Sequence, residues 1–424
     1  SSMDVGVHTL GCKVNQSESE EIQHELLQYG FDIVDPHETQ ADVYILNTCS
    51  VTVSAEASGR KIARRFRRKS PDSTIIFTGC YAELAGDQLR EDLPEVDYIV
   101  GTSDKKAIPR LVLEETDWEP SATKGNCEVA FRNRKFLKIQ DGCNDYCTFC
   151  IIPHTRPPVE SMPSQKVLEK IRTLSQDQGY GEIVLSGVHL GEYGKDRTEE
   201  VDLTGLVEKI ADASLSCRIR LSSVEPQDVT ERLVQVVANS KRFCSHLHLP
   251  IQSGSDRILD RMQRNYDRDY LFDLAKLCRS HDSDFALNTD VIVGFPGETD
   301  DDFQRTRELV ETIHFSRLHV FRYSERPGTA ASKMNDTVHS KVRKERCREM
   351  IELGERLKQD FARRFEGRED TVLIEDQSVE GQPVGYTSYY LPARVQGNVH
   401  PNQRYPVKLK QFNGEYFEAE RIPA

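Results

Sequence analysis

Three cysteines lie close together in the sequence, at Cys143, Cys147 and Cys150, with the spacing Cys-x3-Cys-x2-Cys. Cysteine thiolates at such spacing are ligands of iron–sulfur clusters or of structural zinc. Structural zinc requires four ligands, usually from two paired knuckles, and no matching second pair follows in this sequence. The three thiolates therefore predict a four-iron cluster with one iron left open for a substrate or cofactor.

A second set of cysteines, Cys12, Cys49 and Cys80, is spread over the N-terminal part of the chain. Each follows an apolar run that reads as a parallel strand, and the carboxyl ends of parallel strands meet at one edge of a sheet. Unrelated buried thiols would have no reason to share this position. We therefore expect a second metal cluster here. The other five cysteines are expected to be structural thiols: Cys127, Cys217, Cys244, Cys278 and Cys347.

Length and composition restrict the class of protein. The chain has 424 residues, of which 37% are hydrophobic, enough for two or three domains with their own cores. No run approaches the roughly 18 apolar residues of a membrane span, and the first residues lack the regions of a signal peptide, so we expect a cytoplasmic protein that contacts no membrane. A net charge of −13 means that any nucleic acid must be held by local basic patches.

The N-terminal elements predict a parallel α/β domain over residues 3–120. Short apolar runs at 5–10, 43–46, 75–78 and 98–100 read as strands separated by helical stretches. The helix over residues 17–29 is expected to begin with a capping box formed by Ser17 and Glu20 and to end at Gly30. The segment from Glu114 to Gly125, rich in Glu, Pro, Ser, Thr and Gly, is expected to be a linker.

Six further apolar runs, each followed by a helical stretch, lie at 136–139, 182–187, 218–223, 246–251, 286–294 and 318–323. A complete eight-stranded barrel needs roughly 250 residues, so these repeats predict a partial, open (β/α) barrel over residues 130–366. A long charged helix over 341–366 ends this part. Residues 367–424 are β-rich and separated by turn residues, which predicts a small antiparallel β-barrel.

On these residues the sequence resembles the radical S-adenosylmethionine superfamily, whose signature is the Cys-x3-Cys-x2-Cys run after the first strand of a (β/α)6 barrel. Two three-cysteine sites followed by a β-rich module resemble, more narrowly, its methylthiotransferase family, from about Asp4 to Pro423. The opening run Thr9-Leu-Gly-Cys12 and its continuation to Gln16 resemble the branch that acts on N6-threonylcarbamoyladenosine in tRNA. Similar blocks follow at 248–255, 290–299 and 385–387.

The resemblance implies a transferase that inserts sulfur and a methyl group at C2 of the modified adenosine beside the anticodon. It implies two 4Fe–4S clusters and two molecules of S-adenosylmethionine per turnover, one of them reductively cleaved to a 5′-deoxyadenosyl radical. The implied partners are tRNA, a flavodoxin-like or ferredoxin-like electron donor and a sulfur donor. Alternatives are the same chemistry on isopentenyladenosine in tRNA or on a ribosomal-protein aspartate, and a tRNA-binding redox sensor with no enzymatic activity.

Cofactor contacts are expected within the cysteine loop and after the strands of the barrel. Tyr146 and Phe149 would pack around the cluster and adenine, although aromatic residues in such loops are as often simple packing. Glu225 beside a proline is equally an ordinary turn residue, and Gly294 equally a plain turn glycine. The other candidates follow the second, third and fourth strands: Ser186, Gly187, Ser223, Gln252 and Ser253.

The densest basic segment runs from residue 60 to residue 69. On a helix, Arg60, Arg64 and Arg68 share a face beside Arg65, which gives a positive stripe suited to phosphate contacts, with a solvated helix face as the alternative. The C-terminal module resembles the TRAM β-barrel that grips tRNA in this family, with Arg394 and Lys408 available. Between Cys150 and Pro163 the sequence departs from the family pattern, because Pro157 and Pro158 remove two backbone donors.

Overall fold

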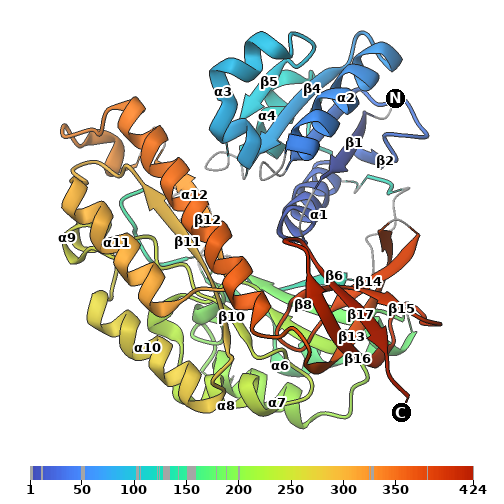
Figure 1. Ribbon diagram of the computed structural model, residues 1–424, viewed down its shortest axis with the longest axis vertical. Coiled ribbons are helices and arrows are strands. Elements are labelled where there is room, and N and C mark those ends of the chain that lie inside the picture. The colour runs from blue at the N-terminus through green and yellow to red at the C-terminus, as the bar shows by residue number, and fades with distance from the viewer. Residues whose placement is uncertain are drawn as a thin grey trace. The chain divides into compact units, whose positions relative to one another are not determined.

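A computed structural model describes residues 3–10, 13–48, 53–101, 105, 107–121, 123, 125–127, 134–141, 143–149, 159–177, 179–187, 189–198, 201–323, 325, 329–379 and 381–423. The chain forms two compact units, residues 1–131 and 132–424 (Figure 1). Each unit has hydrophobic clusters of its own. None of the described helices combines the length and apolar character needed to cross a membrane.

The first unit contains a five-stranded sheet in the order β2-β1-β3-β4-β5, in which every pairing is parallel. The predicted parallel α/β fold is confirmed. The strands are β1 (Asp4–Thr9), β2 (Asp32–Val34), β3 (Val43–Thr48), β4 (Thr74–Gly79) and β5 (Tyr98–Val100). The helices are α1 (Lys13–Gln28), α2 (Val53–Lys69), α3 (Cys80–Asp92) and α4 (Ile108–Glu115).

Helix α1 begins at Lys13, so the expected capping box at Ser17 is wrong. Helical structure instead starts close to the end of β1, and Ser19 binds the sheet edge. Its hydroxyl oxygen accepts a hydrogen bond from Thr9 Oγ1 at 2.6 Å and another from Asn47 Nδ2 at 3.0 Å. These tertiary contacts set the position of the helix, whereas the sequence pattern described only local capping.

The segment predicted as a linker packs on the first unit. Trp118 Nε1 donates a hydrogen bond to the carbonyl oxygen of Tyr29 at 3.0 Å, and its ring lies 5.6 Å from that of Phe31. The amide of Gly125 donates to the carbonyl oxygen of Leu27 at 3.0 Å. One large aromatic residue is enough to bury a segment whose remaining composition is typical of a loop.

The second unit begins with six parallel strands: β6 (Arg134–Asp141), β8 (Glu182–Gly187), β9 (Arg218–Leu221), β10 (His246–His248), β11 (Ala286–Val293) and β12 (Arg317–Arg322). They pair in chain order, with bridges at Ile219–Phe243 and Ser223–His248 joining β9 to β10. The short strand β7 (Glu160–Ser161) pairs with β6 in the antiparallel sense. The described residues show no pairing of β6 with β12, so the predicted partial, open barrel is confirmed.

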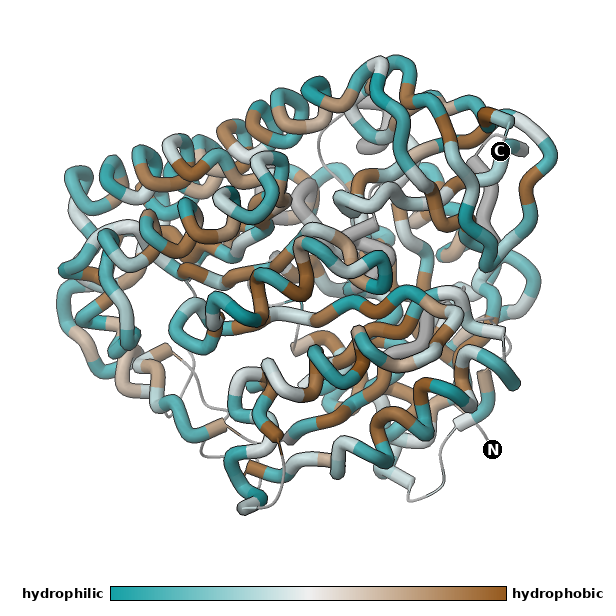
Figure 2. Tube along the Cα trace, turned by 90° about the horizontal axis from the view of Figure 1, so that it is seen from below, coloured by the Kyte–Doolittle hydropathy of each residue, from teal (hydrophilic) through white to brown (hydrophobic). Residues whose placement is uncertain are grey.

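Amphipathic helices surround these strands (Figures 1 and 2). Helix α11 begins with a capping box in which Thr299 and Asp302 exchange hydrogen bonds. The long C-terminal helix predicted for 341–366 is present as α12. The helices are α6 (Ser164–Arg172), α7 (Leu203–Asp212), α8 (Glu231–Asn239), α9 (Asp256–Arg261), α10 (Arg268–His281), α11 (Asp300–Ile313) and α12 (Ser340–Arg363).

The chain ends in a closed barrel of five strands in the order β13-β14-β15-β17-β16. Its strands are β13 (Glu369–Val379), β14 (Gln382–Tyr386), β15 (Pro392–Gln396), β16 (Arg404–Phe412) and β17 (Phe417–Arg421). The prediction of a purely antiparallel barrel needs one correction, because β15 and β17 pair in parallel. Strand directions around a closed ring alternate completely only when the number of strands is even, so five strands require a parallel pair.

The C-terminal barrel docks on the amino-terminal end of the partial barrel. Arg218, the first residue of β9, donates hydrogen bonds to the carbonyl oxygens of Tyr386 at 3.2 Å and Thr387 at 3.3 Å. The Arg220 guanidinium lies 4.2 Å from the centre of the Tyr390 ring. The block at 385–387, singled out in the sequence, is therefore a docking segment opposite the strand ends that carry the cysteine loop.

Candidate cluster and cofactor site

The cysteine loop follows β6 and is fixed by backbone contacts to distant parts of the second unit. Thr148 donates through its amide to the carbonyl oxygen of Met262 at 3.2 Å, and its own carbonyl oxygen accepts from the amide of Ala331 at 2.7 Å. Phe149 packs edge to face with Phe295 at 6.4 Å. Cys150 and residues 151–158, which include the two prolines, lie outside the described residues.

Cys147 lies beside a buried cation. Its Sγ accepts a hydrogen bond from Arg264 Nη1 at 3.2 Å. The Arg264 guanidinium also contacts Glu225 and donates through Nε to Tyr266 Oη at 2.9 Å. Burial raises the pKa of the Cys147 thiol to about 11. Because iron binds the thiolate, loading of this site releases the thiol proton.

Cys143 lies beside a histidine that is held by a carboxylate. Its Sγ is 3.4 Å from His189 Nδ1, and His189 Nε2 is 2.6 Å from Asp228 Oδ2. Burial opposes protonation of His189, but its hydrogen bonds to Asp228 and Cys143 outweigh that effect and raise its pKa to about 10. The amide of Asp145 donates to Cys143 Sγ at 3.4 Å. Sequence reasoning assigned no role to His189, Asp228 or Arg264.

The candidate cofactor residues end or follow successive parallel strands. Ser186 and Gly187 end β8, and Ser223 follows β9. A Cβ atom at Gly187 would lie 2.6 Å from Gln140 Oε1, so only glycine fits this close approach. Tyr146, in the cysteine loop, is 56% exposed. Parallel strands end at the same end of a barrel, which places these residues on the side of the cysteine loop.

Gln252 has an unusual backbone for a residue with a side chain, with φ of 68°. Its amide donates to the carbonyl oxygen of Asp290 at 2.9 Å, and its carbonyl oxygen accepts from the amide of Ile292 at 2.9 Å. Such strain persists where surrounding structure holds it and is common at ligand sites. Ser253, by contrast, is fully buried with its Oγ 3.3 Å from Thr306 Oγ1, in the contact with α11.

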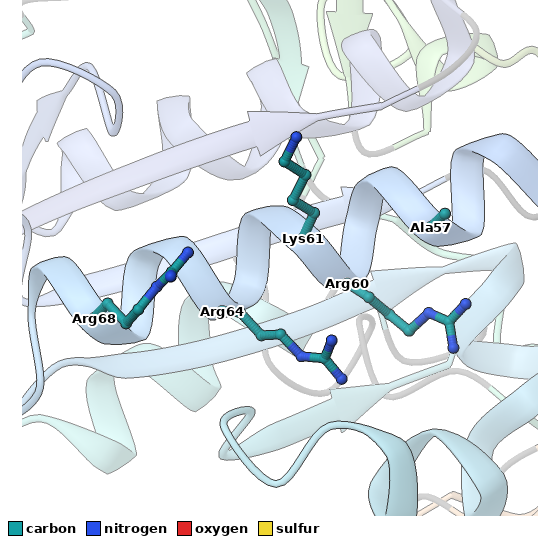
Figure 3. Close-up of a pocket in the computed structure, with 5 residues that line it drawn as sticks. All are labelled: Ala57, Arg60, Lys61, Arg64 and Arg68. Carbon is teal, nitrogen blue, oxygen red and sulfur yellow. The ribbon is translucent and has the colours of Figure 1, made fainter.

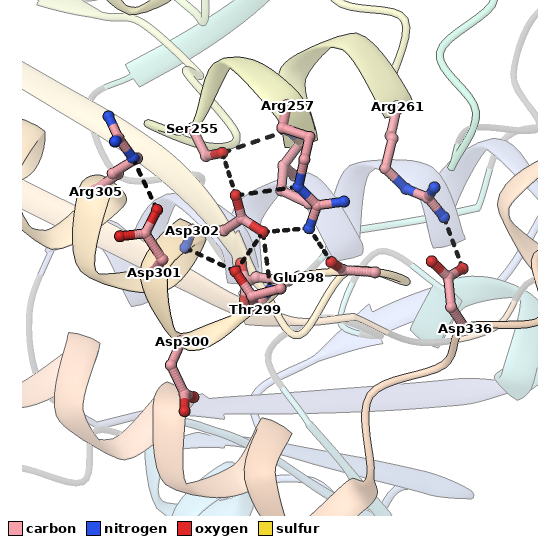
Figure 4. A network of polar contacts seen from close by, with 12 residues as sticks. Ser255, Arg257, Arg261, Glu298, Thr299, Asp300, Asp301, Asp302, Arg305 and Asp336 are labelled. Carbon is pink, nitrogen blue, oxygen red and sulfur yellow. Dashed lines mark hydrogen bonds and ion pairs between the residues drawn. The ribbon is translucent and has the colours of Figure 1, made fainter.

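Gly294 adopts a left-handed conformation with φ of 72°, and a Cβ atom there would lie 2.2 Å from Arg343 Cγ of α12. The close approach that requires glycine is therefore to α12. Glu298 Oε1 accepts from the Gly294 amide at 2.9 Å and from Arg346 at 3.0 Å. The neighbouring Asp302 is also fixed in place. Its carboxylate accepts a hydrogen bond from Ser255 Oγ and is paired with Arg257 (Figure 4).

Three buried polar atoms at this end of the barrel have no hydrogen-bond partner in the described part of the chain. They are Ser222 Oγ after β9, Gln227 Oε1, and Tyr323 Oη after β12. Buried polar groups are normally satisfied, but these atoms are covered by protein and by themselves identify no ligand. The two described thiols at this barrel end, each beside a nitrogen donor, fit ligands of an iron–sulfur cluster.

The second cysteine set falls mostly outside the described residues. Cys12 and Cys49 are not described, and Cys80 is the first residue of α3, with its side chain not described. The strands that precede them, β1, β3 and β4, are neighbours in one parallel sheet. The strand order reverses between β1 and β3, where parallel sheets of this order bind ligands. Thr78 Oγ1 is buried at this edge without a partner in the described part of the chain.

The basic stripe lies on α2 and divides into two groups. Arg67 and Lys69 are structural, because they bind backbone carbonyls of neighbouring segments. Arg64 is 53% exposed and lies 3.6 Å from a glutamate. Figure 3 shows Arg60 and Arg64 on the same side of α2. An open hollow of about 380 Å³ is lined by Ala57, Arg60, Lys61, Arg64 and Arg68.

The candidate RNA contacts of the C-terminal barrel differ from one another. Arg394 is paired with Glu418 and its guanidinium lies 5.1 Å from the Tyr416 ring centre, so its charge is already balanced. Lys408 is exposed on β16. The described residues therefore offer more unpaired positive charge on α2 than at the two barrel positions named from sequence.

One further polar cluster was not expected from sequence. Asp290 Oδ1 lies 2.9 Å from His248 Nε2 and 3.1 Å from His319 Nδ1, across β10, β11 and β12. Burial opposes ionisation of Asp290, but the two histidines outweigh it and hold its pKa well below the usual range. The group has the residue types of a metal site. Its hydrogen bonds account for its geometry without an ion.

Comparisons with known proteins agree with this description. Residues 137–310 match the radical SAM superfamily, and residues 4–101 match a family described as Uncharacterized protein family UPF0004. The chain is 36% identical over 422 residues to "Threonylcarbamoyladenosine tRNA methylthiotransferase MtaB" of Thermotoga maritima, covering 97% of this chain and 95% of that protein. The protein of the same name from Bacillus subtilis is 36% identical, with 93% and 90% covered.

A second group of relatives has a different name. "tRNA-2-methylthio-N(6)-dimethylallyladenosine synthase" of Thermodesulfovibrio yellowstonii is 32% identical, with 99% of this chain and 98% of that protein covered. Among solved structures, a radical S-adenosylmethionine methyltransferase from Kitasatospora setae is 11% identical, covers 78% of this chain and 77% of its own, and has a TM-score of 0.42.

Proposed function

This chain belongs to the radical SAM tRNA methylthiotransferases, and we propose that it converts N6-threonylcarbamoyladenosine in tRNA to the 2-methylthio derivative. The observation that carries the proposal is the position of Cys143 and Cys147 in the loop that follows β6, at the carboxyl end of the six parallel strands. Relatives from several bacteria, 35% to 36% identical to this chain, carry the threonylcarbamoyladenosine name.

Two 4Fe–4S clusters and S-adenosylmethionine are the cofactors, and when bound they supply the one-electron chemistry and the sulfur that an unactivated C2–H bond requires. We propose that Cys143, Cys147 and Cys150 hold one cluster. The second would be held by Cys12, Cys49 and Cys80, which follow neighbouring strands at the point where the strand order reverses. Gln252, Ser186 and Gly187 would line the cofactor side of the barrel end.

The three parts of the chain would then have separate tasks. We propose that residues 3–120 carry the sulfur-bearing cluster, residues 130–366 generate the radical, and residues 367–424 contact tRNA together with α2. The reaction needs an electron donor of the flavodoxin or ferredoxin type and a sulfur donor. Because the substrate is tRNA, the proposed compartment is the cytoplasm.

The direct test is mass spectrometry of tRNA nucleosides after expression in a strain that lacks the activity. We expect the 2-methylthio derivative of N6-threonylcarbamoyladenosine to appear with the unaltered chain and to be absent with Cys147→Ala. The same digest measures the isopentenyladenosine product, and ribosomal proteins from the same cells report aspartate methylthiolation. Either of these products in place of the expected nucleoside would reassign the substrate.

A further inference from the structure

Cys147 is contacted by Arg264, whose guanidinium is held in place by several hydrogen bonds. Arg264 Nη1 donates to Cys147 Sγ at 3.2 Å, and the same guanidinium contacts Glu225. Arg264 Nε donates to Tyr266 Oη at 2.9 Å, and Tyr266 Oη in turn donates to the carbonyl oxygen of Ile251 at 2.8 Å. The Arg264 side chain is 4% exposed, so water does not compete for these hydrogen bonds.

The second described ligand has the same arrangement. His189 lies between Cys143 Sγ at 3.4 Å and Asp228 Oδ2 at 2.6 Å. Once the sulfur is an iron-bound thiolate it has no proton, so any hydrogen bond between the two must be donated by His189 Nδ1. Each thiol therefore meets a nitrogen donor backed by a carboxylate, although His189 follows β8 and Arg264 lies between α9 and α10.

A hydrogen bond donated to a ligand sulfur affects electron transfer. Three thiolates give a four-iron cluster a negative net charge, and one-electron reduction adds more negative charge to the iron and sulfur atoms. A fixed N–H donor, and above all a cationic one, therefore stabilises the reduced state more than the oxidised state and raises the reduction potential. The carboxylates hold the donors in place and keep the site from accumulating positive charge before the cluster is loaded.

We propose that Arg264 is a positioning residue that raises the reduction potential of the radical cluster by donating to Cys147, with Glu225 and Tyr266 fixing its guanidinium. His189, held by Asp228, acts in the same way on Cys143. The proposal rests on the proposed function, since it needs the four-iron cluster at these cysteines. It also gives Glu225 a role different from the expected cofactor contact, because its carboxylate is engaged with Arg264.

The test is a redox titration followed by electron paramagnetic resonance on the protein in which Cys12, Cys49 and Cys80 are alanine, so that one cluster is measured. With Arg264→Met we expect the ratio of reduced to oxidised cluster at a fixed potential to fall about tenfold, which is 59 mV for a one-electron couple. Arg264→Lys keeps the charge but lacks the rigid fork, so a smaller decrease is expected. No substrate is present in this titration, so the measured ratio does not depend on turnover.

Arg261→Met is the matched control. Arg261 ends α9 and donates to the carbonyl oxygen of Pro296 at 3.1 Å, and it contacts neither described cysteine, so the ratio should stay unchanged. As a second readout, iron–sulfur stretching bands in resonance Raman spectra should shift on transfer to heavy water in the parent and shift less in Arg264→Met, which keeps the donors to Cys143.

An unchanged ratio in Arg264→Met with full iron content overturns the proposal. If Arg264→Met does not retain iron, Arg264→Lys and His189→Gln decide, and an unchanged ratio in both overturns it. Absence of iron from the parent itself would instead contradict the cluster assignment at Cys143, Cys147 and Cys150, and with it the proposed function. Iron analysis of the parent therefore separates the two failures.

Discussion

At the residue scale, the described cysteines divide into candidate ligands and candidate structural thiols by position. Cys217, Cys244, Cys278 and Cys347 are buried, and burial in apolar surroundings favours the uncharged thiol, as the raised pKa of Cys278, about 12, illustrates. Cys143 and Cys147 are only partly buried and lie beside nitrogen donors. Reactive and ligating thiols have such surroundings, so we expect metal at these two and at none of the four buried cysteines.

The first prediction is the iron content. Reconstituted protein should hold about eight iron atoms per chain, from two four-iron clusters. Replacing Cys143, Cys147 and Cys150 together by alanine should leave about four, because the second set of cysteines is on another part of the chain. Chemical iron and sulfide analysis under anaerobic conditions measures this. Cys278→Ala is the control and should keep all eight. Either complete loss of iron or no loss of iron in the triple variant would contradict the presence of two separate clusters.

The cysteine ligands could be predicted from sequence because their residue type and spacing are local properties. Arg264 could not, because it lies 117 residues from Cys147 along the chain and nothing in its local sequence marks it. His189 closely follows the expected cofactor residues Ser186 and Gly187, but its contact with Asp228 spans 39 residues and depends on how β8 and the segment after β9 converge. Residues that act through another residue become visible only in the folded chain.

At the element scale, strand positions were predictable and pairings were less so. The apolar runs located β3, β8 and β11 closely, since a buried parallel strand is a continuous apolar run between turns. Strand β2 contains only two apolar residues after Asp32, so no apolar run marks it, whereas β5, which also has three residues, is apolar throughout. The parallel pairing of β15 with β17 follows from closing an odd number of strands, which is a property of the whole barrel and of no single segment.

The second prediction concerns the docking of the C-terminal barrel. Arg218→Met removes the donor to the carbonyls of Tyr386 and Thr387 and breaks the buried ion pair of Arg218 with Glu182 at 2.9 Å. Breaking a buried ion pair costs roughly 3–5 kcal/mol, so we expect a lower melting temperature and faster amide exchange over residues 386–391. Hydrogen–deuterium exchange by mass spectrometry locates the change.

Two variants make this prediction specific. Adding Glu182→Leu to Arg218→Met removes the buried carboxylate that has lost Arg218 and should restore part of the lost stability. Arg348→Met, on the exposed face of α12 beside Glu345 and Glu352, removes two surface ion pairs and should lower the melting temperature much less than Arg218→Met. If Arg348→Met destabilised the protein as much as Arg218→Met, the contact of Arg218 with the C-terminal barrel would contribute no more stability than a surface ion pair.

At the scale of the whole molecule, the two cysteine sets belong to two compact units, which allows their chemistry to be separated. The third prediction is that Cys12, Cys49 and Cys80 replaced by alanine leave reductive cleavage of S-adenosylmethionine intact and abolish the methylthio product. The reason is that Cys143, Cys147 and their supporting contacts all lie within residues 132–424. Chromatography of 5′-deoxyadenosine and nucleoside mass spectrometry measure the two outcomes. Loss of cleavage in folded, iron-containing protein would show that the sites are not independent.

The fourth prediction concerns how a chain of net charge −13 holds tRNA. Diffuse attraction is unavailable, so binding must come from local basic surfaces, and α2 offers exposed Arg64, Arg65 and Arg68. Replacing these three by alanine should weaken tRNA binding and reduce the slope of log affinity against log salt by about 0.7 to 0.9 per lost phosphate contact. Arg394→Ala, which removes an arginine already paired with Glu418, should change the slope less.

Binding is measured by filter retention over a range of salt concentrations, with cleavage of S-adenosylmethionine in the absence of tRNA as the check on folding. An unchanged slope in the triple variant would make α2 a solvated face and move the RNA contact to the C-terminal barrel.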